Sequence, residues 1–183
     1  RAMWQGQVKG SAKLEKGLKA FDAEDFAQQP VNQPNAQFTR LVVNSSFDRD
    51  LKILGTGLKY SGTLQAQFSK DRLYGGQQFS LGGPSTLRGV EQPLALGSSG
   101  VFLRNELEYA TGAKLGPWFG TLAAYGAVDY GQIFKQKSLG INYFDAASGT
   151  LGLRMKDGRL TADLSYSEVF KSAASALPQT GVT

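Results

Sequence analysis

Apolar and polar residues alternate with a period of two along most of the chain, which is typical of β-strands. The longest example runs from Leu58 to Ser69, where every even-numbered position is apolar or glycine and every odd-numbered position is polar. Similar alternation predicts seven strands, at residues 2–17, 36–48, 57–70, 100–110, 118–134, 149–156 and 159–170. Helical periodicity is nearly absent, so the predicted fold class is all-β.

The predicted strands are long, and their two faces suit a membrane better than a protein core. Several span nine to seventeen residues, whereas strands of globular proteins average about 5–6 residues and tilted strands that cross a bilayer need about 9–11. The polar face carries charges along its length, which a dry sandwich core would not tolerate. The apolar face is rich in Gly, Ala and Leu, with aromatic residues near the strand ends as in a lipid-facing band. These aromatic residues are Trp4, Tyr60, Phe68, Tyr109, Trp118, Tyr166 and Phe170.

The connections between the predicted strands are alternately long and short. They cover residues 18–35, 49–56, 71–99, 111–117, 135–148 and 157–158, the last being an Asp-Gly hairpin signal. Outer-membrane barrels alternate long extracellular loops with short periplasmic turns in this way. We therefore predict an antiparallel transmembrane β-barrel in the outer membrane of a Gram-negative bacterium. A soluble lipocalin-like or sandwich protein is the alternative.

Seven antiparallel strands are too few to close such a barrel, because bacterial single-chain barrels have an even number of strands, about eight or more. Gly181, Val182 and Thr183 also have the pattern of the start of a further strand. An unpaired strand edge is not tolerated in lipid. We expect residues 1–183 to form one part of a larger barrel domain that lacks strands at both ends.

Composition excludes several kinds of chemistry. The 183 residues include no cysteine and no histidine, which excludes disulfides, thiol nucleophiles, Cys/His zinc sites and catalytic triads that need an imidazole. The net charge is +5, but the basic residues are dispersed, so nucleic-acid binding is not indicated. Glu106 and Glu108 share one strand face, and such a pair is common in a polar lumen. We predict no enzyme, no metal or cofactor and no small-molecule substrate.

The longest connection, residues 71–99, carries the most distinctive motif, QFSLGGPSTLRGV at residues 78–90. Gly82, Gly83 and Gly89 indicate a folded excursion between two strands, and Arg88 is the single charged residue of the motif. Loops of this length are usually functional or disordered. Exposed to water, the apolar residues of this loop would form a sticky patch, so we predict that it folds back into the barrel lumen. These apolar residues are Phe79, Leu81, Leu87, Val90, Leu94 and Leu96.

The motif resembles the signature of the sixth extracellular loop in the TpsB two-partner secretion transporters, the haemolysin and haemagglutinin exporters that are distantly related to BamA. Members typically show a Gly-Gly pair followed by Val-Arg-Gly-aromatic, whereas here the second element reads Leu87-Arg88-Gly89-Val90. The following strand, FLRNELEY at 102–109, resembles the strand after that loop. Asp129-Tyr130-Gly131, about forty residues after Arg88, resembles the family's second barrel signature, Asp-x-Gly. The resemblance covers roughly residues 35–183, the C-terminal part of the barrel.

The resemblance implies that the complete protein is a sixteen-stranded barrel with two periplasmic POTRA domains and an N-terminal plug helix, which residues 1–183 do not contain. It further implies a pore that exports one dedicated TpsA-type exoprotein, such as a haemolysin, an adhesin or a contact-dependent inhibition toxin. Outer-membrane lipid would surround the apolar face. The alternatives are a BamA-like insertase, a patatin-type self-exporter barrel and a passive porin.

The polar face of the strands would line a hydrated lumen of mixed charge, which suits a passing polypeptide better than a strongly ion-selective filter does. Asp129 lies on this face, and the small residues Ala127 and Gly131 beside it leave room for an incoming loop. The resemblance implies that Arg88 contacts Asp129 and clamps the loop tip to the barrel wall, since a guanidinium offers a two-pronged match to a carboxylate. The predicted lumen-lining residues are Lys59, Gln65, Gln67, Arg104, Glu106, Glu108, Arg154, Lys156 and Asp163.

Overall fold

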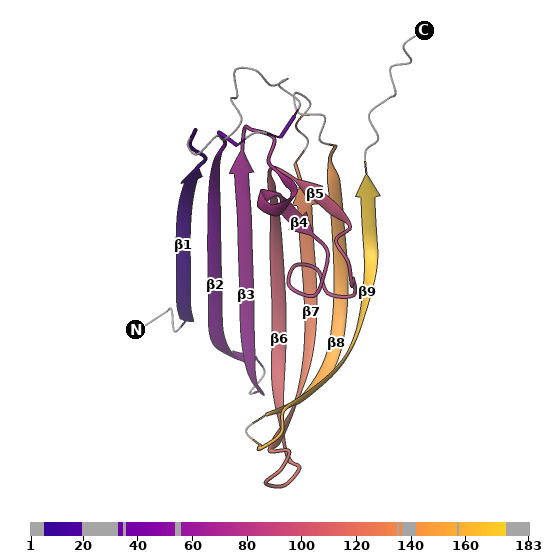
Figure 1. Ribbon diagram of the computed structural model, residues 1–183. Helices are drawn as coiled ribbons and strands as arrows, with labels where there is room; N and C mark the ends of the chain where they lie inside the picture. The colour runs from indigo at the N-terminus through magenta and orange to yellow at the C-terminus, as the bar shows by residue number, and fades with distance from the viewer. Residues whose placement is uncertain are drawn as a thin grey trace.

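The computed structural model describes residues 6–19, 33–34, 36–53, 56–134, 136, 142–156 and 158–174. Within these ranges, seven long strands form one antiparallel sheet in chain order (Figure 1). They are β1 (Gly6–Lys16), β2 (Thr39–Ile53), β3 (Thr56–Ser69), β6 (Gly100–Lys114), β7 (Thr121–Ile133), β8 (Phe144–Lys156) and β9 (Ala162–Ala174). The all-β, antiparallel fold class is confirmed. No helix in the described part of the chain is long and apolar enough to cross a membrane.

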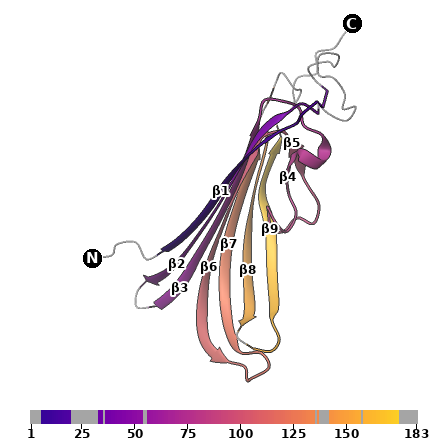
Figure 2. The ribbon, with the colours of Figure 1, turned by 60° about the vertical axis from the view of Figure 1, so that its left-hand side comes forward.

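The loop between β3 and β6 contains structure of its own. A single 3₁₀ turn, η2 (Gly75–Gln77), leads into a small hairpin of β4 (Phe79–Leu81) and β5 (Ala95–Gly97). Figure 2 shows that the sheet is curved and that this hairpin lies against one of its two faces. We call this the loop face and the opposite one the apolar face.

Four strands extend at least four residues further than the alternation predicts: β6 and β9 by four residues at their ends, and β2 and β8 by five. β2 continues five residues past the predicted end and pairs with β3 as far as Ile53 and Thr56. β8 begins five residues early, at Phe144. The charged residues after Asp48 and the small residues after Asp145 do not alternate in polarity, yet the ladder hydrogen bonds carry both strands on because backbone pairing does not depend on side-chain polarity.

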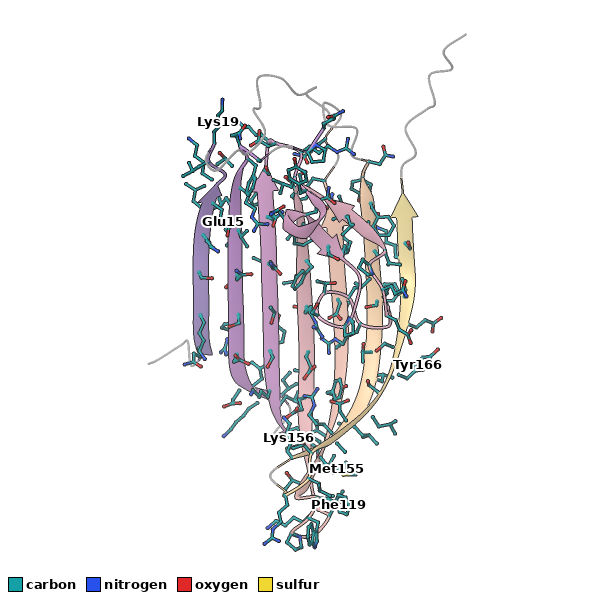
Figure 3. The ribbon with its side chains drawn as sticks, viewed as in Figure 1. Glu15, Lys19, Phe119, Met155, Lys156 and Tyr166 are labelled. Carbon is teal, nitrogen blue, oxygen red and sulfur yellow. The ribbon has the colours of Figure 1, made fainter. Side chains whose placement is uncertain are left out.

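The hairpin between β8 and β9 is wider than the predicted two-residue turn, because β9 begins at Ala162 and not at residue 159. The residues just before β9 contact the turn between β6 and β7. The Leu160 N–H donates to the Trp118 carbonyl at 2.8 Å, and the Arg159 guanidinium lies 5.2 Å from the centre of the Trp118 ring. The two short turns thus brace each other at the end of the sheet where Figure 3 labels Phe119 and Met155.

The apolar face carries rows of exposed apolar side chains along its strands, a surface that suits lipid rather than water. They include Val8, Leu14, Leu41, Phe68, Leu103, Leu107, Val128, Leu151, Leu164, Tyr166 and Phe170. Asn105 interrupts these rows, but its side chain is satisfied: it accepts from the Tyr60 hydroxyl at 2.6 Å and donates to the Val128 carbonyl at 3.2 Å. A polar side chain with both ends hydrogen-bonded is far less costly in an apolar setting than an unpaired one.

Some predictions lie outside the described residues. These are the start of the first strand with Trp4, the Asp157 position of the last turn, and the further strand expected at Gly181–Thr183.

Candidate functional site

The loop hairpin is anchored to the loop face by a small buried apolar cluster. Phe79 and Leu81 of β4 pack against Phe102 of β6 and Ile133 of β7, and all four are at most 4% exposed. The Phe79 and Phe102 ring centres are 6.1 Å apart. Phe102 breaks the polar row of its strand because it faces the loop hairpin and not water.

Gly131, in the Asp-x-Gly signature, lies close against Leu81 of the loop hairpin. A Cβ at this position would lie 2.0 Å from Cδ1 of Leu81, so only glycine leaves room for the hairpin. In the loop itself, Gly82, Gly83 and Gly89 have φ angles of +110°, +97° and +82°, which favour glycine. Glycine is therefore required at Gly131 for space, and it is favoured at the three loop positions by their positive φ angles.

We expect Phe102→Ala to loosen the loop hairpin by about 3–5 kcal/mol, since it removes a large buried aromatic side chain from the cluster. Limited proteolysis of the full-length protein in detergent should then cut within residues 79–99 well before the wild type is cut. Phe68→Ala is the matched control, because the Phe68 ring is exposed on the apolar face. Equal cleavage of both variants would show that the cluster does not hold the loop.

Polar side chains tie the two ends of the loop to β3. Gln67 donates to the carbonyls of Gln77 at 2.9 Å and Ser98 at 3.2 Å. The Ser98 hydroxyl accepts from the Leu73 N–H at 3.1 Å, and Ser99 accepts from the Ser69 N–H at 2.9 Å. Gln67 is on the predicted face, but the loop covers it. The role of Ser98 and Ser99 was not predicted, because serines are common in loops and give no sequence signal of a specific contact.

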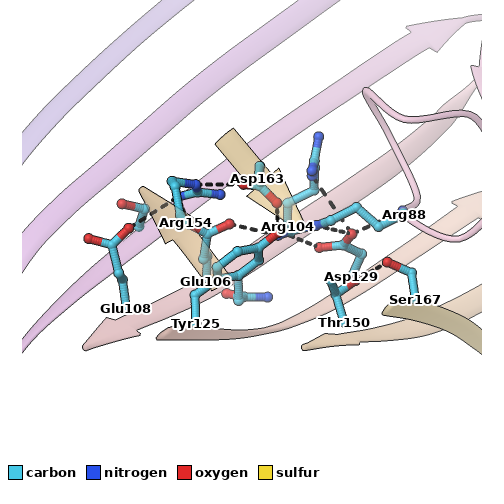
Figure 4. Close-up of polar contacts among 12 residues, drawn as sticks. Arg88, Arg104, Glu106, Glu108, Tyr125, Asp129, Thr150, Arg154, Asp163 and Ser167 are labelled. Atoms are coloured by element: carbon cyan, nitrogen blue, oxygen red, sulfur yellow. Dashed lines mark hydrogen bonds and ion pairs between the residues drawn. The ribbon is translucent and has the colours of Figure 1, made fainter. Parts of the chain in front are cut away.

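At the tip of the loop, Arg88 is held by two carboxylates from neighbouring strands (Figure 4). Its Nε and Nη2 donate to Oδ2 and Oδ1 of Asp129 at 2.8 and 3.0 Å, and its backbone N–H also donates to Oδ2 at 3.1 Å. Its Nη1 donates to Oε2 of Glu106 at 2.7 Å. The side chain of Asp129 is 1% exposed and that of Arg88 13%. This is a desolvated, two-pronged ion pair with a second acceptor that the sequence did not indicate.

Arg88 remains charged in this setting. Burial alone would lower the pKa of its guanidinium, but the hydrogen bonds and charges of Asp129 and Glu106 outweigh burial and raise the pKa above its usual range.

The pair is one end of a longer charged network on the loop face. Glu106 also accepts from Nη1 of Arg154 at 2.9 Å, and that same atom donates to Glu108 at 3.1 Å. Nε of Arg154 donates to Asp163 at 2.7 Å, and Lys156 donates to Glu108. Arg88, Arg104, Arg154 and Lys156 supply four positive charges, and Glu106, Glu108, Asp129 and Asp163 supply four negative ones.

Arg104 connects the loop turn to the same site. Its Nη1 donates to the carbonyls of Pro84 and Ser85 at 2.9 and 3.0 Å, while its Nε lies 3.8 Å from Oδ2 of Asp129. Arg104 and Asp129 are direct partners in the register of β6 and β7. The turn is thus held through its backbone and the tip through Arg88.

The remaining predicted residues contribute less. Lys59 is exposed and sits opposite Glu108 in the β3–β6 register, but the Glu108 carboxylate binds Arg154 and Lys156. Gln65 lies on the same face, opposite Phe102. Leu87 is fully buried beneath the tip and Val90 is half-buried.

Tyr125 is a residue that the sequence analysis missed as a member of this site. Its hydroxyl donates to Asp163 at 2.7 Å, and its ring lies 4.3 Å below the Arg154 guanidinium. It was the largest side chain on its face of the strand, which is the one signal that could have marked it. Among the described residues, no group of three or more acidic side chains is arranged to hold a metal ion.

Comparisons with known proteins identify a family for this chain. The family model described as "Haemolysin secretion/activation protein ShlB/FhaC/HecB" matches residues 1–155. The outer membrane transporter CdiB of Dickeya dadantii (strain 3937) is 28% identical over 135 residues, which are 74% of this chain and 23% of that protein. CdiB of Escherichia coli O6:K15:H31 (strain 536 / UPEC) is 33% identical over 122 residues, 67% of this chain and 20% of that protein.

A solved structure of CdiB from Escherichia coli superposes with a TM-score of 0.75 at 26% sequence identity, covering 92% of this chain and 30% of that one. The chain therefore spans less than a third of the length of the relatives that it matches.

Proposed function

The chain belongs to the ShlB/FhaC/HecB family of haemolysin secretion/activation proteins, and from that premise we propose that the whole protein is an outer-membrane pore that exports a dedicated, large exoprotein by two-partner secretion. The observation that carries this proposal is the contact between Arg88 and Asp129, which joins the two signature motifs across the loop face. The proposed cargo is a TpsA-type haemolysin, adhesin or contact-dependent toxin. The proposal assigns the chain no enzymatic activity.

In this proposal the apolar face meets lipid and the loop face lines the export path. Residues 1–183 form part of the barrel wall, and the loop at 71–99 occupies the lumen. POTRA domains and a plug helix would belong to parts of the whole protein outside these residues. A network with four charges of each sign offers a passing chain both kinds of partner without selecting for net charge.

The residues on the loop face can hold the loop, orient it and release it, and nothing in their chemistry calls for nucleotide or metal. Folding of the cargo outside the cell would draw the chain outward, because a pore lowers a barrier and supplies no free energy. The loop is then a gate whose closed position is the one described above.

Export by the full-length protein can be tested in a strain that carries the gene for the partner exoprotein and lacks the gene for this protein. We expect the exoprotein to be absent from the medium and to return when the full-length gene is supplied. When the cells are fractionated, the barrel should be found in the outer-membrane fraction. Exoprotein in the medium of the deletion strain at the wild-type level would contradict the proposal.

The position of the loop can be tested by cysteine labelling in intact cells. We expect Ser85→Cys to react slowly with a bulky, membrane-impermeant thiol reagent. Ser85 is exposed on the loop face, but it lies at the loop turn held by Arg104, inside the proposed lumen that the reagent would have to enter. Gly76→Cys should react fast, since position 76 is exposed at the outer end of the loop and a Cβ there meets nothing within 4 Å. Labelling of both positions at one rate would show that the loop does not fold inward.

A further inference from the structure

A groove on the apolar face has no part in the proposed export path. It has a volume of about 660 Å³ and lies where β1, β2 and β3 end beside the long loop. Its floor is apolar, and three of its floor residues, Leu14, Leu41 and Phe68, are direct partners across the three strands. The Phe68 ring stacks on Phe134, with centres 6.0 Å apart and planes 20° apart. A floor of this kind fits acyl chains.

Two lysines flank the groove on the side toward the ends of the strands. Lys16 follows Leu14 by two residues, and Lys70 follows Phe68 by two residues, so alternation places both on the apolar face above the floor. One strand, β2, separates them, which puts them roughly 10 Å apart at a strand spacing of about 4.8 Å. The end of β1 is where Figure 3 labels Glu15 and Lys19.

Both lysines are exposed, and within the described residues neither makes an ion pair or a hydrogen bond through its side chain. The contrast with Lys171 on the same face is informative, since that ammonium is paired with Asp145 at 2.5 Å. Among the described residues, Asp71 is the one carboxylate that lines the groove, and it already accepts from the Thr39 N–H at 2.7 Å. The groove thus combines an apolar floor with two ammonium groups available to an anion.

We propose that this groove binds a phosphorylated glycolipid of the outer leaflet, with acyl chains on Leu14, Leu41 and Phe68 and phosphate between Lys16 and Lys70. The proposal rests on the proposed function in one respect: the end of the sheet that carries the long loop must be the extracellular end. Among the described residues, the buried Oε1 of Gln136, which also lines the groove, has no hydrogen-bond partner. A hydroxyl or amide N–H of a glycolipid would supply the missing donor.

The test uses the full-length protein in detergent and measures retention of diphosphoryl lipid A by native mass spectrometry. The double variant Lys16→Gln/Lys70→Gln should bind about 30-fold more weakly, which is the conversion of about 1 kcal/mol for each lysine near a phosphate surface. The control, Lys9→Gln/Lys52→Gln, removes two exposed lysines of the same strands β1 and β2 from the loop face and should bind as the wild type does. Lipid A stripped of its phosphates should bind weakly to every variant, and inorganic phosphate alone should not displace lipid A.

Unchanged lipid A retention in Lys16→Gln/Lys70→Gln would overturn the proposal, as would equal retention of the dephosphorylated lipid or displacement by inorganic phosphate. These outcomes are separate from failure of the proposed function. If the wild type retains no lipid A, or if Lys16→Gln/Lys70→Gln retains it unchanged, while export is intact, this inference alone is overturned. A protein found outside the outer-membrane fraction overturns the export proposal.

Discussion

Arg88→Ala should reduce export of the exoprotein at least tenfold while the barrel still inserts into the outer membrane. The substitution leaves Asp129 with a side chain that is 1% exposed and, among the described residues, with no closer cation than Nε of Arg104 at 3.8 Å. Removing one partner of a buried pair costs about 3–5 kcal/mol, whereas an exposed pair contributes about 0–1 kcal/mol. The loop tip would then leave its position on the sheet. The measurement is the amount of exoprotein in the medium, normalised to the amount of barrel in the outer-membrane fraction.

Asp129→Ala should also impair export, but less severely. Arg88 then keeps its hydrogen bond to Glu106, so part of the attachment persists. The double variant Arg88→Ala/Asp129→Ala should lose no more than Arg88→Ala does, because both changes break the same contact. Lys59→Ala is the matched control, since Lys59 is an exposed cation on the same face. Additive losses, or full export by Arg88→Ala, would show that this pair does not control the loop.

The long strands of this sheet were predictable because a two-residue period is set by the backbone and shows directly in the sequence. The deviations from that period turned out to mark contacts. Phe102 breaks a polar row because the loop hairpin packs on it, and Asn105 breaks an apolar row because Tyr60 and Val128 satisfy it. Of these two breaks, the one at Phe102 marks where the loop packs on the sheet, and the one at Asn105 marks a contact between strands.

The charged network could not be predicted, for a physical reason. Its members come from the loop and from β6, β7, β8 and β9, and alternation fixes the face of each side chain but not the register of one strand against the next. Glu106 and Arg154 are 48 residues apart in the sequence. Only the pairing of β6 with β7 and of β7 with β8 brings Nη1 of Arg154 within 2.9 Å of Oε1 of Glu106. The family resemblance supplied the partner of Arg88 on β7, but not the second acceptor on β6.

The ends of the strands could not be predicted from the alternation of apolar and polar residues either. β9 starts late because Leu160 hydrogen-bonds to the neighbouring turn at Trp118, a contact between residues 42 positions apart that no local signal reports. This hydrogen bond to a distant turn therefore sets a boundary that the Asp-Gly signal places three residues earlier.

Gly131→Val should dislodge the loop hairpin and give the barrel a leak. Even a Cβ at this position would lie 2.0 Å from Leu81 Cδ1 and 3.2 Å from its Cγ. Leu81 cannot move aside within its cluster, because it is fully buried among Phe79, Phe102 and Ile133. Overpacking of a dense cluster costs about 1–3 kcal/mol, and moving the whole hairpin off the sheet is the alternative. The expected readouts are higher conductance in planar bilayers and growth inhibition by a large antibiotic that the wild type excludes.

A second substitution separates this steric cause from general damage to β7. Leu81→Ala removes the atoms that would collide, so Leu81→Ala/Gly131→Val should leak less than Gly131→Val alone. Gly126→Val, on the apolar face of the same strand, should not leak, because a Cβ there meets only Leu151 at an ordinary 3.6 Å. If Gly126→Val leaks as much as Gly131→Val, or if Leu81→Ala gives no rescue, the leak comes from a damaged strand. A rescue confined to the Leu81 pair would mean that the fit between one glycine and one leucine keeps the loop against the sheet.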